Sequence, residues 1–110
     1  MLSELLAYVP VDRFALHMHD TRGTALANIF AGLLLGISSF DSSAGGLGGC
    51  PYAPGASGNV SSEDLVSMLD NMNIQTGISV EKLCEASIQI ERALKKTLPS
   101  KIMAIFRQTS

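Results

Sequence analysis

Charged residues are scarce in this chain of 110 residues: Asp, Glu, Lys and Arg make up 16% of it, against 46% hydrophobic residues. Soluble domains usually carry about 25% charged residues, so the composition excludes a disordered tail, a charged linker and a coiled coil. Basic residues are few as well, and the net charge is -2. Because clustered basic side chains bind a nucleic-acid backbone, we expect no nucleic-acid partner. The apolar excess indicates that much of the chain lies inside something larger.

Long hydrophobic runs are also absent. The longest, from Ala25 to Ile37, contains Asn28 and is shorter than the about twenty residues that a membrane span needs, so we expect no membrane partner. No secretory signal opens the chain, which favours the cytoplasm, or the mitochondrial matrix if the source is eukaryotic. The two cysteines, Cys50 and Cys84, form no CxxC motif, and we expect both to be reduced.

Hydrophobic spacing predicts strands that alternate with helices. Strands are expected over residues 13–19, 37–43 and 58–60, and helices over residues 2–9, from Thr24 to Gly36, after Ser61, and over residues 80–96. Alternating β and α units imply a parallel sheet and therefore an α/β protein. Two or three strands are too few for a complete sheet of this kind, and the chain starts inside a helix. We therefore expect a piece of a longer chain.

Two of these helices carry more specific expectations. Ser61 is a typical N-cap residue, and Asp64 three positions later predicts a variant of the capping box. In the last helix Cys84 is expected to serve packing, and Pro99 to end the helix. The apolar stripe expected to be buried there consists of Leu83, Ala86, Ile90 and Leu94.

A glycine-rich segment over residues 44–58 separates the second and third predicted strands. It holds six of the ten glycines, and a loop this long in a compact domain is usually functional or disordered. A flexible linker is the alternative, but the Cys-Pro-Tyr sequence from Cys50 to Tyr52 argues against it. Cys50 is either a reactive thiol on a movable loop or an incidental loop cysteine. The glycines match neither phosphate-binding pattern.

His17 and His19 form the first candidate site. Residues two apart on a strand face the same side, so both imidazoles would be able to hold one divalent ion. The alternative is an inert, hydrogen-bonded pair at a strand end. Asn59 would add an amide oxygen to such a site, although its position before a helix favours a turn residue. Asp41 ends the second strand near the same face and would orient a ligand histidine.

Five segments of the chain together resemble one known family. They read Leu-His-Met-His-Asp-Thr over residues 16–21, Ala-Leu-Ala-Asn over 25–28, Asp-Ser-Ser over 41–43, Gly-Leu-Gly-Gly-Cys-Pro-Tyr-Ala over 46–53, and Gly-Ala-Ser-Gly-Asn over 55–59. These segments are similar to the C-terminal third of 3-hydroxy-3-methylglutaryl-CoA lyase, and shorter matches continue to Leu83. The Gly-Leu-Gly-Gly-Cys-Pro-Tyr stretch is highly specific to this lyase within the wider group of metal-dependent lyases and aldolase-like enzymes.

The resemblance implies the C-terminal part of a TIM (β/α)8 barrel, about three βα units. The whole chain would then be a single partial barrel domain, with the last βα units in residues 1–77 and a C-terminal helical extension in residues 78–110. It also implies a carbon–carbon lyase that cleaves 3-hydroxy-3-methylglutaryl-CoA, an acyl-CoA substrate, to acetyl-CoA and acetoacetate. The implied cofactor is a divalent metal cation, Mg²⁺ or Mn²⁺.

The same resemblance assigns roles to four residues. His17, His19 and Asn59 match metal ligands of the family, and Cys50 matches its catalytic cysteine. His17 also matches a residue that helps to move the proton of the substrate alcohol.

The chain departs from the family in several places. Arg22 and Thr24 stand where the family usually has tyrosine and glutamine, and Ala44-Gly45 replaces valine-alanine. The early Arg-Asp pair and the acidic residues of the middle strands are absent. One hypothesis is that the chain is a portion of a complete lyase. Its partner would then be the missing N-terminal barrel portion or further copies of itself in a homo-oligomer. The other is a truncated, non-catalytic fragment that associates with a full-length lyase.

Overall fold

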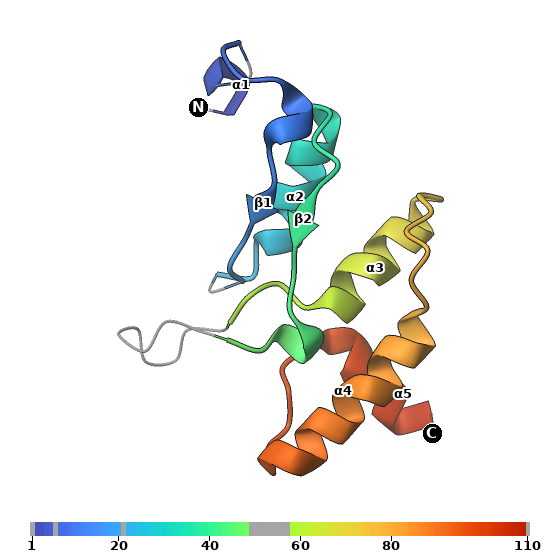
Figure 1. The fold of residues 1–110 in the computed structure, drawn as a ribbon. Helices are drawn as coiled ribbons and strands as arrows, with labels where there is room; N and C mark the ends of the chain where they lie inside the picture. The colour runs from blue at the N-terminus through green and yellow to red at the C-terminus, as the bar shows by residue number, and fades with distance from the viewer. Residues whose placement is uncertain (1, 6, 21, 49–57, 110) are drawn as a thin grey trace.

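The structure is a computed structural model that describes residues 2–5, 7–20, 22–48 and 58–109 (Figure 1). Its elements are α1 (Leu2–Leu5), the 3-10 turn η1 (Val11–Arg13), β1 (Leu16–His17), α2 (Ala25–Leu34), β2 (Phe40–Asp41), the 3-10 turn η2 (Ala44–Gly46), α3 (Ser62–Asn71), α4 (Val80–Leu94) and α5 (Lys101–Thr109). In Figure 1 the β1–α2–β2 unit lies at one end and the α4–α5 pair at the other. Helix α3 contacts α2, α4 and α5 and so connects the two ends.

The β1–α2–β2 unit contains the parallel pairing expected of an α/β protein. β1 and β2 pair in parallel, with Leu16 opposite Phe40 and His17 opposite Asp41. Both strands are much shorter than predicted, because residues 11–13 turn as η1 and only two residues of each strand pair in register. Within the predicted strand at 58–60, the structure has a single bridge, from Asn59 to His19, and the next residue, Ser61, bridges Ser43.

Helix α2 packs closely on β1. Its first amide, that of Ala25, donates a hydrogen bond to Asp20 Oδ1 at 3.1 Å, and it ends just before Gly36, whose φ is +92°. A Cβ on Gly32 would come within 2.4 Å of the Leu16 side chain, so glycine allows the close approach. The hydrophobic residues of α2 are only partly buried: Ile29 is inaccessible, but Leu34 remains 74% exposed.

Ser61 caps α3 as predicted, because the Asp64 amide donates to Ser61 Oγ at 3.0 Å. The Asp64 carboxylate does not complete a capping box. It instead accepts hydrogen bonds from Ser100 Oγ at 2.7 Å and from the Ile102 amide at 2.9 Å, at the start of α5. Helix α5 was not among the predicted elements, and this carboxylate satisfies amide donors at its N-terminus.

The buried face of α4 differs from the prediction. Cys84 and Ser87 are fully buried, which confirms the packing role of Cys84, whereas Ala86 and Leu94 are exposed and Leu83 and Ile90 are half-buried. The cause is a polar contact between α4 and α3, described below, that turns the Ser87 side of the helix inward. The helix also ends before Pro99, at a left-handed Lys95.

The apolar interior consists of two clusters. Between α2 and α3 lie Ala25, Ile29, Val60, Leu65 and Leu69. The second cluster, among the C-terminal helices, has Cys84, Leu98 and Met103 at its centre. No helix in the described ranges is long and apolar enough to cross a membrane.

The contact of Leu98 with Gly45 generates a first prediction. Gly45 and Gly77 both have positive φ, but a Cβ on Gly45 would lie 2.3 Å from Leu98 Cδ1, whereas a Cβ on Gly77 would meet nothing within 4 Å. Gly77→Ala should lower the free energy of unfolding by about 1 kcal/mol through backbone strain. Gly45→Ala should lower it by about 1–3 kcal/mol more, because Leu98 must move. Urea titration measures both; equal losses would contradict the packing of Leu98 on Gly45.

Candidate metal site

The three predicted metal ligands lie together. His17 ends β1 and His19 follows two residues later, with their ring centroids 5.3 Å apart. Asn59, on the far side of the glycine-rich segment, places its Oδ1 2.7 Å from His17 Nε2. Residues separated by 42 positions in the chain therefore form one cluster of two imidazoles and an amide oxygen.

Backbone pairing and a side-chain hydrogen bond hold Asn59 in this place. An antiparallel bridge joins Asn59 to His19, and on either side of it Val60 N donates to Met18 O at 3.0 Å and Asp20 N to Gly58 O at 3.1 Å. The Asn59 Nδ2 group donates to the Leu47 carbonyl at 3.2 Å. That contact leaves Oδ1 facing His17, so Asn59 is part of the cluster rather than a turn residue.

Both ring nitrogens of His17 face acceptor oxygens. Nε2 faces Asn59 Oδ1, and Nδ1 lies 3.3 Å from Asp41 Oδ2. A neutral imidazole carries only one N–H, so it can donate a hydrogen bond to only one of these two oxygens. Adjacent ligands of a six-coordinate Mg²⁺ lie about 3 Å apart, since its bonds are about 2.1 Å long and meet near right angles. The 2.7 Å separation of His17 Nε2 and Asn59 Oδ1 fits a shared divalent cation.

The ligand set is incomplete within the described part of the chain. There, no three His, Cys, Asp or Glu side chains are grouped closely enough to hold a metal ion. His17, His19 and Asn59 supply two nitrogens and one oxygen, fewer than the six ligands that Mg²⁺ requires. Further oxygen ligands must come from water, substrate or another segment of protein.

Cys50, the predicted catalytic cysteine, lies outside the described residues. The two described ends of the glycine-rich segment meet closely: a Cβ on Gly58 would fall 1.4 Å from the Gly48 carbonyl oxygen. Only glycine at position 58 permits this approach. Gly48 and Gly58, which are described, therefore both lie next to Asn59.

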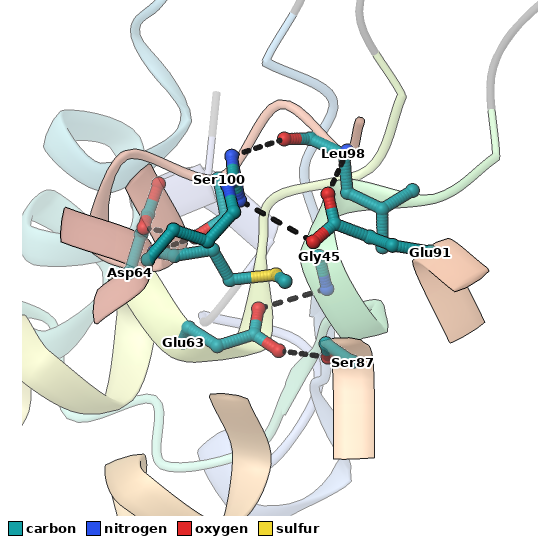
Figure 2. A network of polar contacts seen from close by, with 9 residues as sticks. Gly45, Glu63, Asp64, Ser87, Glu91, Leu98 and Ser100 are labelled. Carbon is teal, nitrogen blue, oxygen red and sulfur yellow. Dashed lines mark hydrogen bonds and ion pairs between the residues drawn. The ribbon is translucent and has the colours of Figure 1, made fainter. Parts of the chain in front are cut away.

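Glu63 was not identified from the sequence and is the most buried charged residue described, with no exposed surface. Its Oε2 accepts from the Gly45 amide at 2.8 Å and from Ser61 Oγ at 3.1 Å, and its Oε1 accepts from Ser87 Oγ at 2.5 Å. Figure 2 shows the carboxylate between Gly45 and Ser87. It joins α3 to η2 and to α4. In the sequence, Glu63 cannot be told from an ordinary acidic residue in a first helical turn, where the helix dipole favours one.

Cys84 lies close to this carboxylate and is fully buried. Burial raises the pKa of the Cys84 thiol, and the negative charges of Glu63 and Asp64 raise it further, with a small opposing effect of Arg107. A raised pKa keeps the sulfur protonated and unreactive, which agrees with a packing role for Cys84.

A second prediction concerns Glu63. Glu63→Leu should lower the free energy of unfolding by about 3–5 kcal/mol, because the Gly45 amide and two serine hydroxyls lose their acceptor inside the protein. Glu63→Gln keeps one acceptor oxygen and should cost less than Glu63→Leu. Urea titration followed by circular dichroism measures both.

Glu81 provides the matched control. It occupies the same second position of α4 that Glu63 occupies in α3, but it is exposed. Glu81→Leu should change the free energy of unfolding by no more than about 1 kcal/mol, the helix-dipole contribution. Similar losses for Glu63→Leu and Glu81→Leu would show that the buried hydrogen bonds of Glu63 contribute little.

Comparisons with known proteins identify the family to which the chain is similar. A family model described as HMGL-like matches residues 1–90. The hydroxymethylglutaryl-CoA lyase of Bacillus subtilis (strain 168) is 53% identical over 109 residues, which cover 99% of this chain and 36% of that protein. The structure of hydroxymethylglutaryl-CoA lyase from Pseudomonas aeruginosa matches with a TM-score of 0.94 at 45% identity, over 99% of this chain and 36% of that one.

A third relative is an HMG-CoA lyase from Acinetobacter baumannii, solved in complex with coenzyme A and 3-methylmalate. It matches with a TM-score of 0.85 at 40% identity, over 92% of this chain and 33% of that one. The chain thus spans about a third of the length of these relatives, which agrees with the expected partial barrel. The family model covers most of the chain, and the resemblance predicted from the sequence is confirmed: the chain belongs to the HMGL-like family.

Proposed function

We propose that this chain is the metal-binding portion of a hydroxymethylglutaryl-CoA lyase, which cleaves 3-hydroxy-3-methylglutaryl-CoA to acetyl-CoA and acetoacetate. The observation that carries the proposal is the 2.7 Å approach of Asn59 Oδ1 to His17 Nε2, with His19 alongside. It brings together the residues that match the metal ligands of the family. The relative solved with coenzyme A supports an acyl-CoA substrate.

In this proposal His17, His19 and Asn59 hold Mg²⁺ or Mn²⁺. The bound ion would lower the pKa of the substrate's tertiary alcohol and stabilise the charge that develops on its oxygen. Asn59 contributes a fixed oxygen, because its amide nitrogen is held by the Leu47 carbonyl. The amide oxygen of Asn59 suits Mg²⁺ or Mn²⁺, whereas imidazoles alone suit softer divalent metals, so the choice of Mg²⁺ or Mn²⁺ rests on the family resemblance.

The reaction needs two proton movements. A base removes the proton of the tertiary alcohol, the carbon–carbon bond breaks as the ketone of acetoacetate forms, and the enolate of acetyl-CoA then takes up a proton. We assign that last proton to the Cys50 thiol. His17 is the candidate for moving the alcohol proton. Its Nδ1 faces Asp41, so Nε2 is the nitrogen that faces the site. Nε2 cannot hold the cation and accept a proton at the same time.

A second portion of the barrel must complete the enzyme. The described residues supply three ligands, and the chain spans about a third of its relatives. Residues 1–77 would provide the last βα units, about three in number, and residues 78–110 a helical extension. The alternative is a non-catalytic fragment that associates with a full-length lyase. The apolar side chains left exposed on α2, such as Leu34 at 74%, are expected to be covered by another portion of protein in both cases.

Complementation is the experiment that tests the proposal. The chain is mixed with the N-terminal two-thirds of the Bacillus subtilis lyase, and acetoacetate formation is measured with Mn²⁺ and 3-hydroxy-3-methylglutaryl-CoA. We expect turnover that is lost in His19→Ala and in Asn59→Ala, since each removes a ligand, and that falls at least about a hundredfold in Cys50→Ala, which removes the proton donor.

The control is His19→Ala mixed with the same partner and checked by size-exclusion chromatography, so that loss of assembly is separated from loss of the metal. A folded mixed complex of the unsubstituted chain that forms no acetoacetate would contradict catalysis and support the non-catalytic alternative.

A further inference from the structure

The two strands of the sheet place a carboxylate behind the candidate ligand His17. His17 and Asp41 are paired residues in the parallel register of β1 and β2, so their side chains leave the sheet on the same face. Asp41 Oδ2 lies 3.3 Å from His17 Nδ1. Both side chains are more than half exposed, so strand pairing rather than burial holds them together.

The two nitrogens of His17 have different surroundings. Nδ1 faces a carboxylate, which can only accept a hydrogen bond when ionised, and Nε2 faces the amide oxygen of Asn59, which can also only accept. A proton on Nε2 would occupy the position between these two ligand atoms. A proton on Nδ1, donated to Asp41, leaves the Nε2 lone pair free for a cation. The hydrogen bond made by one imidazole nitrogen selects the tautomer of the other.

We infer that Asp41 is a positioning residue of the metal site, whose carboxylate accepts the Nδ1 proton of His17 and so directs the Nε2 lone pair toward the bound cation. The inference rests on the proposed function, because it assigns Asp41 a role only if His17 holds the metal. Asp41 touches neither the cation nor the substrate. It acts on ring orientation and tautomer, so its replacement weakens metal binding without removing a ligand.

Manganese affinity tests the inference directly. The dissociation constant of Mn²⁺ is measured by electron paramagnetic resonance for the unsubstituted chain, Asp41→Ala, Asp41→Asn and Asp70→Ala. Asp70 is an exposed aspartate on α3, remote from the cluster, and its replacement removes the same charge. Loss of a carboxylate partner of a ligand histidine typically costs 10–100-fold in metal affinity. We expect about a tenfold loss in Asp41→Ala and less than a twofold change in Asp70→Ala.

Asp41→Asn separates positioning from net charge. Its amide oxygen can still accept the Nδ1 proton, so we expect affinity closer to that of the unsubstituted chain than to that of Asp41→Ala. Nitrogen-15 spectra of the histidine rings provide a second readout without metal: Nδ1 should be the protonated nitrogen of His17 in the unsubstituted chain, and the tautomer should shift in Asp41→Ala. Because Asp41 is exposed, neither substitution opens the core.

The outcomes distinguish this inference from the proposed function. Absence of Mn²⁺ binding in the folded complex with the N-terminal portion of the Bacillus subtilis lyase, which completes the barrel, contradicts both. Two results would contradict the role of Asp41 and leave the proposed function standing, provided that the unsubstituted chain binds Mn²⁺ through His17 and His19. In the first, the dissociation constant of Asp41→Ala lies within twofold of that of the unsubstituted chain. In the second, Asp41→Ala and Asp70→Ala lose the same affinity. Protonation of Nε2 in the metal-free unsubstituted chain also overturns the role of Asp41.

Discussion

The buried carboxylate of Glu63 is the interaction on which the arrangement of the site depends. An ionised carboxylate inside a protein is costly unless hydrogen bonds replace its water, and three donors from Gly45, Ser61 and Ser87 do so. The bond to Gly45 fixes the η2 turn. The next residue after that turn, Leu47, offers the carbonyl that orients Asn59. Glu63 therefore connects the helices to the face where the ligands lie.

The C-terminal helices support the same turn from the other side. Leu98 packs on Gly45, and the Ser100 amide donates to the Gly45 carbonyl at 3.2 Å. The connection between α4 and α5 is held by Glu91, which accepts from the Leu98 amide at 2.7 Å and lies 3.4 Å from Arg107. The connection between α4 and α5 thus holds the start of the glycine-rich segment in place through Leu98 and Ser100.

Local signals in the sequence predicted some of this structure well. The Ser61 cap depends on a hydrogen bond within one helical turn. The closeness of the His17 and His19 rings depends on their spacing of two residues in an extended chain. Both could therefore be predicted from neighbouring residues. Strand lengths could not, because pairing is set by neighbouring segments. The sequence also did not reveal the buried face of α4. Its apolar stripe suggested one side, but the hydrogen bond from Ser87 to Glu63, 24 residues away, turns another side inward.

Recognition of the site depended on the resemblance more than on spacing. Asn59 alone resembles a turn residue, and only the fold shows that its amide oxygen meets His17 across the glycine-rich segment. Glu63 gave no signal at all, since its role comes from burial. Cys50 remains a prediction from the resemblance.

The most direct test of this account is a titration of Mn²⁺ into the isotopically labelled chain, followed by NMR. A paramagnetic ion broadens signals of nearby nuclei first. The account predicts that the Asn59 side-chain amide and the signals of His17 and His19 broaden before all others, and that Asn59→Ala weakens the effect. Broadening that begins at acidic surface residues such as Asp70, with the Asn59 amide unaffected, would contradict a metal site formed by this chain.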